Sequence, residues 1–143
     1  MRPMARETSP VFHRTVAAAA VALLIAIGFV AASHAADGSV QDGEDVFRKC
    51  LACHAVGPGA KNRVGPVLND LFGRKPGTIE GFAYSAGNKK AGEGGLVWTE
   101  ETLFKYLEDP RSFVPGTTMA FAGLKDEQDR RDVIAYLKQF SKK

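Results

Sequence analysis

The stretch Cys50-Leu51-Ala52-Cys53-His54 contains both cysteines of this chain and one of its three histidines. Two cysteines three residues apart near a helix end place both thiols where they can form thioethers with two vinyl groups on one edge of a haem. The histidine that follows projects its imidazole from the same turn and can ligate the iron. C-x-x-C-H is a pattern of covalent haem attachment. It predicts one haem c bound through Cys50 and Cys53, with His54 as an axial ligand.

Other uses of the cysteine pair fit the sequence less well. A disulfide between residues three apart on a helix is poorly placed and would close a trivial loop. A thioredoxin-like redox pair would stand in a βαβ context, which the pattern lacks. A zinc site needs further Cys or His ligands, and residues 36–143 offer none beyond this motif.

Residues 1–35 have the pattern of a secretory signal. Arginines precede an uncharged apolar run from Val16 to Ala32, and Ser33-His34-Ala35 provides small residues at a cleavage site. The alternative is an uncleaved membrane anchor, but the run would cover about 25 Å as a helix, short of the ~30 Å hydrocarbon layer. We therefore expect a cleaved signal at 1–35, a single domain at 36–143 and a periplasmic location.

Removing residues 1–35 takes away three arginines and one glutamate, so the formal charge falls from +3 to +1. A nucleic-acid-binding role is disfavoured, because it needs a strong basic footprint. His54 and Met119 then remain as the last residues of their types.

Met119 is the candidate for the sixth iron position. A lone methionine is ordinarily core filler, but this one follows the breakers Pro115 and Gly116 and does not belong to an apolar helical stripe. A filled sixth position makes an electron carrier, whereas an open one permits oxygen chemistry or gas binding. The rivals are therefore a peroxidase-like enzyme and a gas sensor, both of which need an accessible iron.

The remaining pattern predicts about three helices and no sheet. A short amphipathic helix from Gly43 ends at the cysteines, a second begins at Thr99 and ends at Pro110, and Asp126 opens the last. Residues 55–84 and 88–95 are rich in Gly, Pro or polar residues and are expected to be loops. Long loops in a compact domain need a function, and a buried prosthetic group would supply one.

Together these stretches resemble the class I c-type cytochromes, especially bacterial cytochrome c2 and mitochondrial cytochrome c. The resemblance covers residues 43–138 and rests on Cys50–His54, Gly65-Pro66, Leu71–Lys75, Gly81–Tyr84, Trp98–Tyr106, Pro115–Met119, Phe121–Gly123 and Ile134–Leu137. Phe47 stands one residue closer to Cys50 than in the mitochondrial form, and the loop at 88–98 looks longer. The resemblance implies an all-α cytochrome c fold whose first and last helices, close together at Gly43, pack around one covalent haem with long wrapping loops.

The resemblance also implies roles in the haem pocket. The Pro66 carbonyl is expected to accept the free ring N–H of His54, Tyr106 to lie beside the Met119 sulfur and Phe121 to cover the haem edge. The residues expected near the haem propionates are Arg74, Tyr84, Asn88, Trp98 and Thr117.

The function implied is that of an electron carrier, not an enzyme. A monomer would pass single electrons from a donor such as a cytochrome bc1 complex to a terminal oxidase or photosynthetic reaction centre. Cations expected to ring the exposed haem edge and meet acidic partners are Lys49, Lys61, Arg63, Arg111 and Lys125.

Overall fold

The computed structural model describes residues 37–142, and in this range it contains five helices and no strand. The helices are α1 (Val40–Phe47), α2 (Ala86–Glu93), α3 (Glu100–Glu108), α4 (Pro110–Phe113) and α5 (Glu127–Lys138). The all-α prediction is therefore confirmed. The predicted signal segment lies outside the described residues. None of the helices in this part of the chain is both long and apolar enough to cross a bilayer.

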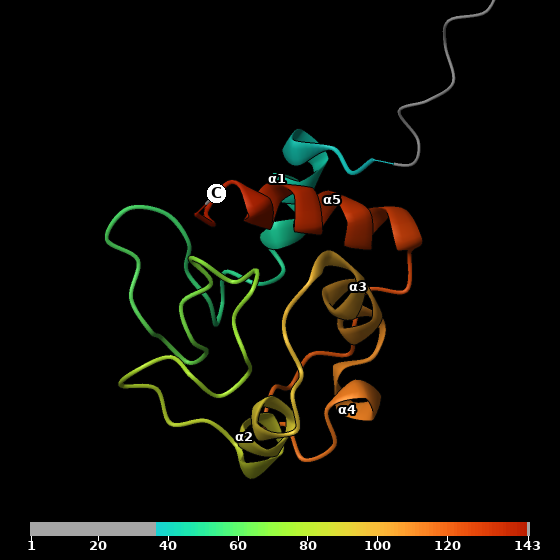
Figure 1. The fold of residues 1–143 in the computed structure, drawn as a ribbon. Coiled ribbons are helices and arrows are strands. Elements are labelled where there is room, and N and C mark those ends of the chain that lie inside the picture. Colours follow the sequence, from blue (N-terminus) through green and yellow to red (C-terminus); the bar gives the residue numbers. More distant parts are fainter. Residues whose placement is uncertain (1–36, 143) are drawn as a thin grey trace, which may run out of the picture. The chain divides into compact units, whose positions relative to one another are not determined.

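The first and last helices pack against each other, as expected (Figure 1). Ser39 caps α1, and Asp126 caps α5 by accepting from two backbone N–H groups in its first turn. A Cβ on Gly43 would overlap the backbone carbonyl of Asp132 in α5, so only glycine permits this close approach. The buried residues at this contact include Val46, Phe47 and Val133.

Helix α3 packs across α5 and begins where the sequence predicts. Thr99 and Thr102 form a reciprocal capping box, in which each side chain accepts from the backbone N–H of the other. The apolar face of the helix buries Leu103, Tyr106 and Leu107. Tyr106 is thereby fixed in the interior, with its hydroxyl directed toward the segment that follows α4.

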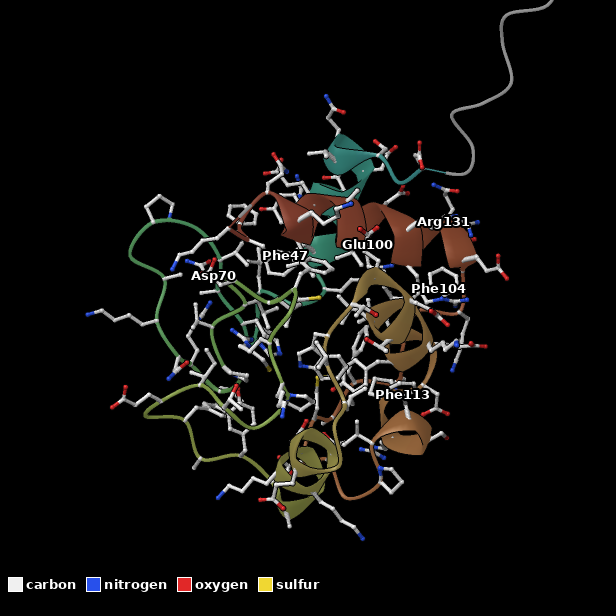
Figure 2. All side chains as sticks on the ribbon, in the orientation of Figure 1. Phe47, Asp70, Glu100, Phe104, Phe113 and Arg131 are labelled. Atoms are coloured by element: carbon white, nitrogen blue, oxygen red, sulfur yellow. The ribbon has the colours of Figure 1, made fainter. Side chains whose placement is uncertain are left out.

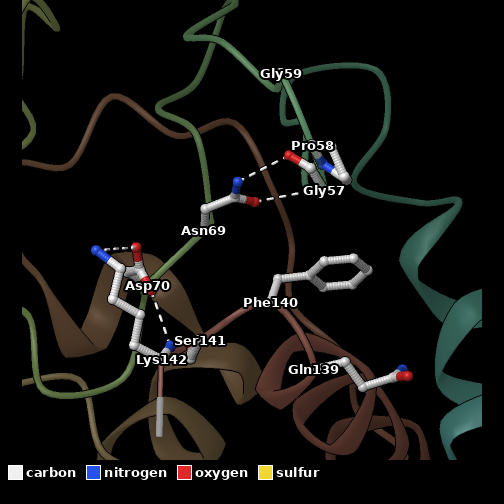
Figure 3. Close-up of a pocket in the computed structure, with 9 residues that line it drawn as sticks. All are labelled: Gly57, Pro58, Gly59, Asn69, Asp70, Gln139, Phe140, Ser141 and Lys142. Carbon is white, nitrogen blue, oxygen red and sulfur yellow. Dashed lines mark hydrogen bonds and ion pairs between the residues drawn. The ribbon is translucent and has the colours of Figure 1, made fainter.

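Residues 55–84 form the long loops that the sequence predicts and lie to one side of the helices (Figure 1). Side chains replace the missing helical hydrogen bonds: the Asn69 amide both accepts from the Gly57 N–H and donates to its carbonyl, each at 2.8 Å. The backbone N–H of Asp70 donates to the Phe140 carbonyl after α5. The residues that make these contacts line a surface hollow of about 350 Å³ (Figure 3), and neither the cysteines nor Met119 lie in its lining.

Two helices were not predicted. Residues 88–95 were expected to be a loop, but most of them lie in α2, which Ser85 caps. The helix that begins after Thr99 ends at Glu108, just before Pro110, as expected, but Pro110 also occupies the first turn of the unpredicted α4 behind the cap Asp109. Proline is favoured there because its missing N–H has no intrahelical partner to lose. Both helices border residues 114–119, the segment that leads to Met119.

Candidate functional site

The cysteine motif forms a continuous turn after α1. The N–H of Cys53 and the N–H of His54 both donate to the Cys50 carbonyl, at 3.0 and 2.9 Å. The two cysteines form no disulfide. Burial raises the pKa of Cys50 to about 11, against an opposing effect of Lys49. The two sulfur atoms therefore sit one turn apart, next in sequence to the imidazole.

The His54 ring is held by the hydrogen bond expected from the resemblance. Its Nδ1 lies 2.7 Å from the carbonyl oxygen of Pro66. Because a carbonyl can only accept, Nδ1 carries the proton and Nε2 keeps its lone pair. Burial lowers the pKa of His54, Arg74 lowers it further, and the Pro66 contact opposes them. The ring is thus a neutral imidazole with a free Nε2, the form that binds a metal.

Glycine is required where the chain passes the imidazole. A Cβ on Gly65 would overlap Cε1 of His54 and come within 2.8 Å of both ring nitrogens. The Gly65 N–H donates to the Cys53 carbonyl at 2.8 Å, which ties this segment to the cysteine turn. Gly65-Pro66 thus seats and orients the ring.

Met119 has polar neighbours around its sulfur and backbone. The Tyr106 hydroxyl donates to Sδ at 3.5 Å. The Thr117 hydroxyl accepts from the Met119 N–H at 3.3 Å and from the Asn88 amide at 3.2 Å. Burial raises the pKa of Tyr106 to about 12, although hydrogen bonding with Thr117 acts the other way. Tyr106, Asn88 and Thr117 thus meet at the candidate sulfur ligand.

Arg74, Tyr84 and Trp98 form a second group. The Arg74 guanidinium donates to the Asn69 and Val67 carbonyls at 2.9 and 3.2 Å, and its backbone carbonyl accepts from the Trp98 N–H at 2.9 Å. Burial lowers the pKa of Arg74 and raises the pKa of Tyr84. The electrostatic interaction between the two groups opposes both shifts. A half-buried cation and a phenol hydroxyl would thus be available to ligand carboxylates.

The apolar residues around these groups are partly buried and pack against the core. Among them are Cys50, Leu68, Phe72, Met119 and Phe121. A thiol pair, a neutral imidazole and a thioether sulfur in apolar surroundings form the donor set of a covalently bound haem with two axial ligands. The residues present therefore fit a haem.

Comparison with known proteins agrees with this donor set. Residues 40–141 match the family model described as cytochrome c. This chain belongs to the cytochrome c family. It is 58% identical over 116 residues to cytochrome c2 of Blastochloris viridis, covering 79% of this chain and 89% of that one. It is 45% identical over 108 residues to cytochrome c of Gibberella zeae, covering 75% of this chain and 99% of that one.

The fold agrees as well. The solved structure of cytochrome c2 from Rhodospirillum centenum superimposes with a TM-score of 0.71 at 50% identity, over 73% of this chain and all of that one. The expected cytochrome c fold and the covalent haem c are confirmed. Proteins of this family are electron carriers.

The five cations expected around the haem edge differ in their contacts. Lys49 pairs with Asp129 of α5 at 2.9 Å, and Lys125 Nζ donates to the Glu108 carbonyl at 2.7 Å. The Arg63 guanidinium donates to the carbonyl of Leu51, inside the cysteine motif, at 2.8 Å. No local pattern in the sequence predicts this contact, because it joins two segments outside the helices. Lys61 and Arg111 have no ion pair among the described residues.

Proposed function

We propose that this cytochrome is a periplasmic single-electron carrier that acts as a monomer between a donor such as a cytochrome bc1 complex and an acceptor such as a terminal oxidase or a photosynthetic reaction centre. Relatives named cytochrome c2 support this assignment. When bound, the haem c supplies the reversible one-electron couple. The chain's own residues hold it, exclude water and present it to partners.

The observation that carries the proposal is the pair of oriented donors. His54 presents Nε2 because Nδ1 is engaged by Pro66, and Met119 presents a sulfur that receives the Tyr106 hydroxyl. We assign these two residues as the axial ligands and Cys50 and Cys53 as the thioether donors. With both axial positions filled, neither peroxide nor a gas reaches the iron, which favours a carrier over an enzyme or a sensor. Thioether ligation favours the reduced iron and raises the potential.

The other pocket residues have supporting roles in this proposal. Arg74, Tyr84, Asn88, Trp98 and Thr117 offer the donors that make buried propionates tolerable. Phe121 covers the haem edge. Pro66 and Tyr106 orient the two axial ligands.

A cleavable export signal at residues 1–35 is part of the proposal. The basic start, the apolar run and the small residues at 33–35 support a cleavable signal, with the domain beginning at Ala36. Intact-mass measurement of the native protein tests this together with haem attachment. We expect the mass of a chain that starts near Ala36 plus one haem. A full-length mass in the membrane fraction would support an anchor instead.

The same measurement on Cys50→Ser and Cys53→Ser tests the thioether assignment. Each variant has one attachment point fewer, so we expect less bound haem and, since the haem completes the core, poorer folding. A fully folded apoprotein would contradict the assignment.

Partner docking at a cationic surface is part of the proposal. Lys49, Lys61, Arg63, Arg111 and Lys125 would steer the haem edge toward acidic partners and raise the association rate. Lys49 is expected to contribute least, because Asp129 offsets its charge.

A further inference from the structure

Arg130 is a buried cation in α5. Only 3% of it is exposed, and its Nε has no hydrogen-bond partner. Within residues 37–142 no carboxylate forms an ion pair with it. A buried, unpaired charge is costly. Its retention at this position calls for interactions that offset that cost.

Those interactions reach the chain just before α5. Nη1 of Arg130 donates to the carbonyls of Leu124 and Lys125, at 2.6 and 3.1 Å. The guanidinium carbon lies 4.4 Å from the centre of the Phe104 ring in α3, a cation–π contact. Side chains on a helix lean toward its N-terminus, which lets Arg130 reach back to residues that precede α5. Leu124 and Lys125 lie at the end of residues 118–125, the segment that carries Met119.

Leu124 is fixed on both of its backbone groups. Its N–H donates to the Leu107 carbonyl in α3 at 2.7 Å, while its carbonyl accepts from Arg130 of α5. Gly123 has φ +92°, and a Cβ there would overlap the Glu108 carbonyl. The end of the segment is therefore held between α3 and α5.

The segment itself has little internal support. In the described part of the chain, residues 118–123 take part in no backbone–backbone hydrogen bond. The contacts that restrain it on the other side are Asn88 with Thr117 and Thr117 with the Met119 N–H. Segments with few hydrogen bonds open at low free energy. The position of the Met119 sulfur therefore depends on the anchors at each end and on the hydrogen bond from Tyr106.

We infer that Arg130 is a positioning residue for Met119. Its charge-assisted hydrogen bonds hold the Leu124–Lys125 end of the segment and so keep the sulfur at the iron. This inference rests on the proposed ligation by Met119. The buried charge is used because hydrogen bonds from a charged donor are about twice as strong as neutral ones.

The test is the rate at which imidazole binds to the oxidised holoprotein, since imidazole enters only when the Met119 sulfur leaves. Arg130→Met keeps the length of the side chain and removes the donors. We expect binding about 10- to 100-fold faster, the factor that corresponds to losing a hydrogen bond from a charged group. Arg130→Lys keeps one charged donor and is expected to be intermediate. It carries the test if Arg130→Met does not fold.

Two controls separate positioning from general destabilisation. Arg131→Met makes the same chemical change one residue away, where the guanidinium also lies near Phe104 (Figure 2) but bonds to Gln128 and Glu127. Val133→Ala weakens the core of the same helix without removing a hydrogen bond to the segment. Rates are compared at denaturant concentrations that give the folded variants the same free energy of unfolding. Under those conditions, both control variants are expected to change the rate of imidazole binding by less than about twofold.

The outcomes are distinct. If the Arg130 variants bind imidazole at the wild-type rate, Arg130 does not position Met119. The same conclusion follows if Val133→Ala accelerates binding equally at matched stability. Either result would leave the proposed ligation by Met119 standing. A wild-type oxidised protein without the long-wavelength absorption band of sulfur-ligated iron would overturn ligation by Met119, and this inference with it.

Discussion

The hydroxyl of Tyr106 donates a hydrogen bond to the sulfur of Met119 across 3.5 Å. The ring that carries it is 8% exposed and packs on Trp98, with ring centres 4.7 Å apart. Because burial raises the pKa of Tyr106 to about 12, the hydroxyl stays protonated and remains a donor at neutral pH. If Met119 ligates the iron as proposed, a donor on its sulfur withdraws electron density from that ligand, which would favour the reduced iron.

Tyr106→Phe is therefore expected to lower the reduction potential. A net hydrogen bond of about 0.5–1.5 kcal/mol corresponds to roughly 20–60 mV for a one-electron couple. Optical redox titration measures the shift. Tyr136→Phe is the matched control, because the Tyr136 ring packs on Phe47 and Phe140 away from Met119. Equal shifts in the two variants would mean that the hydrogen bond to sulfur has no special effect.

Met119→Ala is expected to retain the covalent haem and lose the sulfur ligand. The iron would become high-spin or solvent-ligated, the potential would fall, and peroxidase activity would appear because the sixth position is open. The measurements are the long-wavelength band of the oxidised spectrum, the potential and peroxide turnover. An unchanged spectrum would refute methionine ligation.

The parts of the fold that the sequence predicts are those with local signals. Thr99 and Asp126 cap helices as expected, and the two cysteines with His54 share one turn. Each cap bonds to residues two or three positions further along the chain, and the cysteines and His54 belong to one short motif with a specific chemistry. A local pattern was therefore enough to predict them. Gly43 also lies where a close helix contact was expected.

Helix α2 and Arg130 could not be predicted for the same physical reason. The sequence of α2, AGNKKAGE, has no apolar stripe. Part of its support is tertiary: Gly87 packs against the Pro115 carbonyl and Gly92 against the Pro76 carbonyl. Arg130 lies in a run of charged residues that reads as a solvated face, and its burial follows from the packing of α3 on α5. Long-range contacts leave no periodic pattern in the sequence.

Gly65→Ala is expected to displace the His54 ring, because the added Cβ overlaps Cε1. Overpacking of this kind costs about 1–3 kcal/mol. We expect a lower denaturant midpoint together with a changed axial-ligand spectrum. Gly94→Ala is the control: it lies at φ −72° and its Cβ would meet the Lys90 carbonyl at 3.2 Å, away from the site. A Gly65→Ala protein with native stability and spectrum would show that the chain at Gly65 does not pack tightly against the His54 ring.

Asp109 is expected to make stability depend on acid pH. Its carboxylate accepts from the Ser112 N–H and hydroxyl at 3.1 and 2.9 Å, and these bonds, with the charge of Lys125, lower its pKa. A lowered pKa stabilises the fold above the unfolded value of about 4, and the contribution disappears as pH falls through the folded value. Asp109→Asn keeps a capping acceptor without the charge.

Denaturant midpoints of Asp109→Asn and wild type should therefore differ near neutral pH and converge as the pH falls through the lowered pKa of Asp109. A difference that stays constant over this range would show that the charge of Asp109 is not what stabilises the start of α4.

Charge reversal tests which surface meets the electron-transfer partner. Lys61→Glu with Arg111→Glu changes two proposed docking cations that have no ion pair among the described residues. Lys138→Glu with Lys142→Glu makes the same change in net charge at two exposed lysines near the C-terminal end, which pair with Glu100 and Asp70. Electron transfer to a bc1 complex or an oxidase is measured against ionic strength.

Steering changes association rates about 10- to 1,000-fold and fades as salt shortens the Debye length below about 10 Å. We expect the first pair to slow the reaction and flatten its salt dependence, and the second to have little effect. If both pairs slow the reaction equally, only net charge matters and the docking surface lies elsewhere or is not specific.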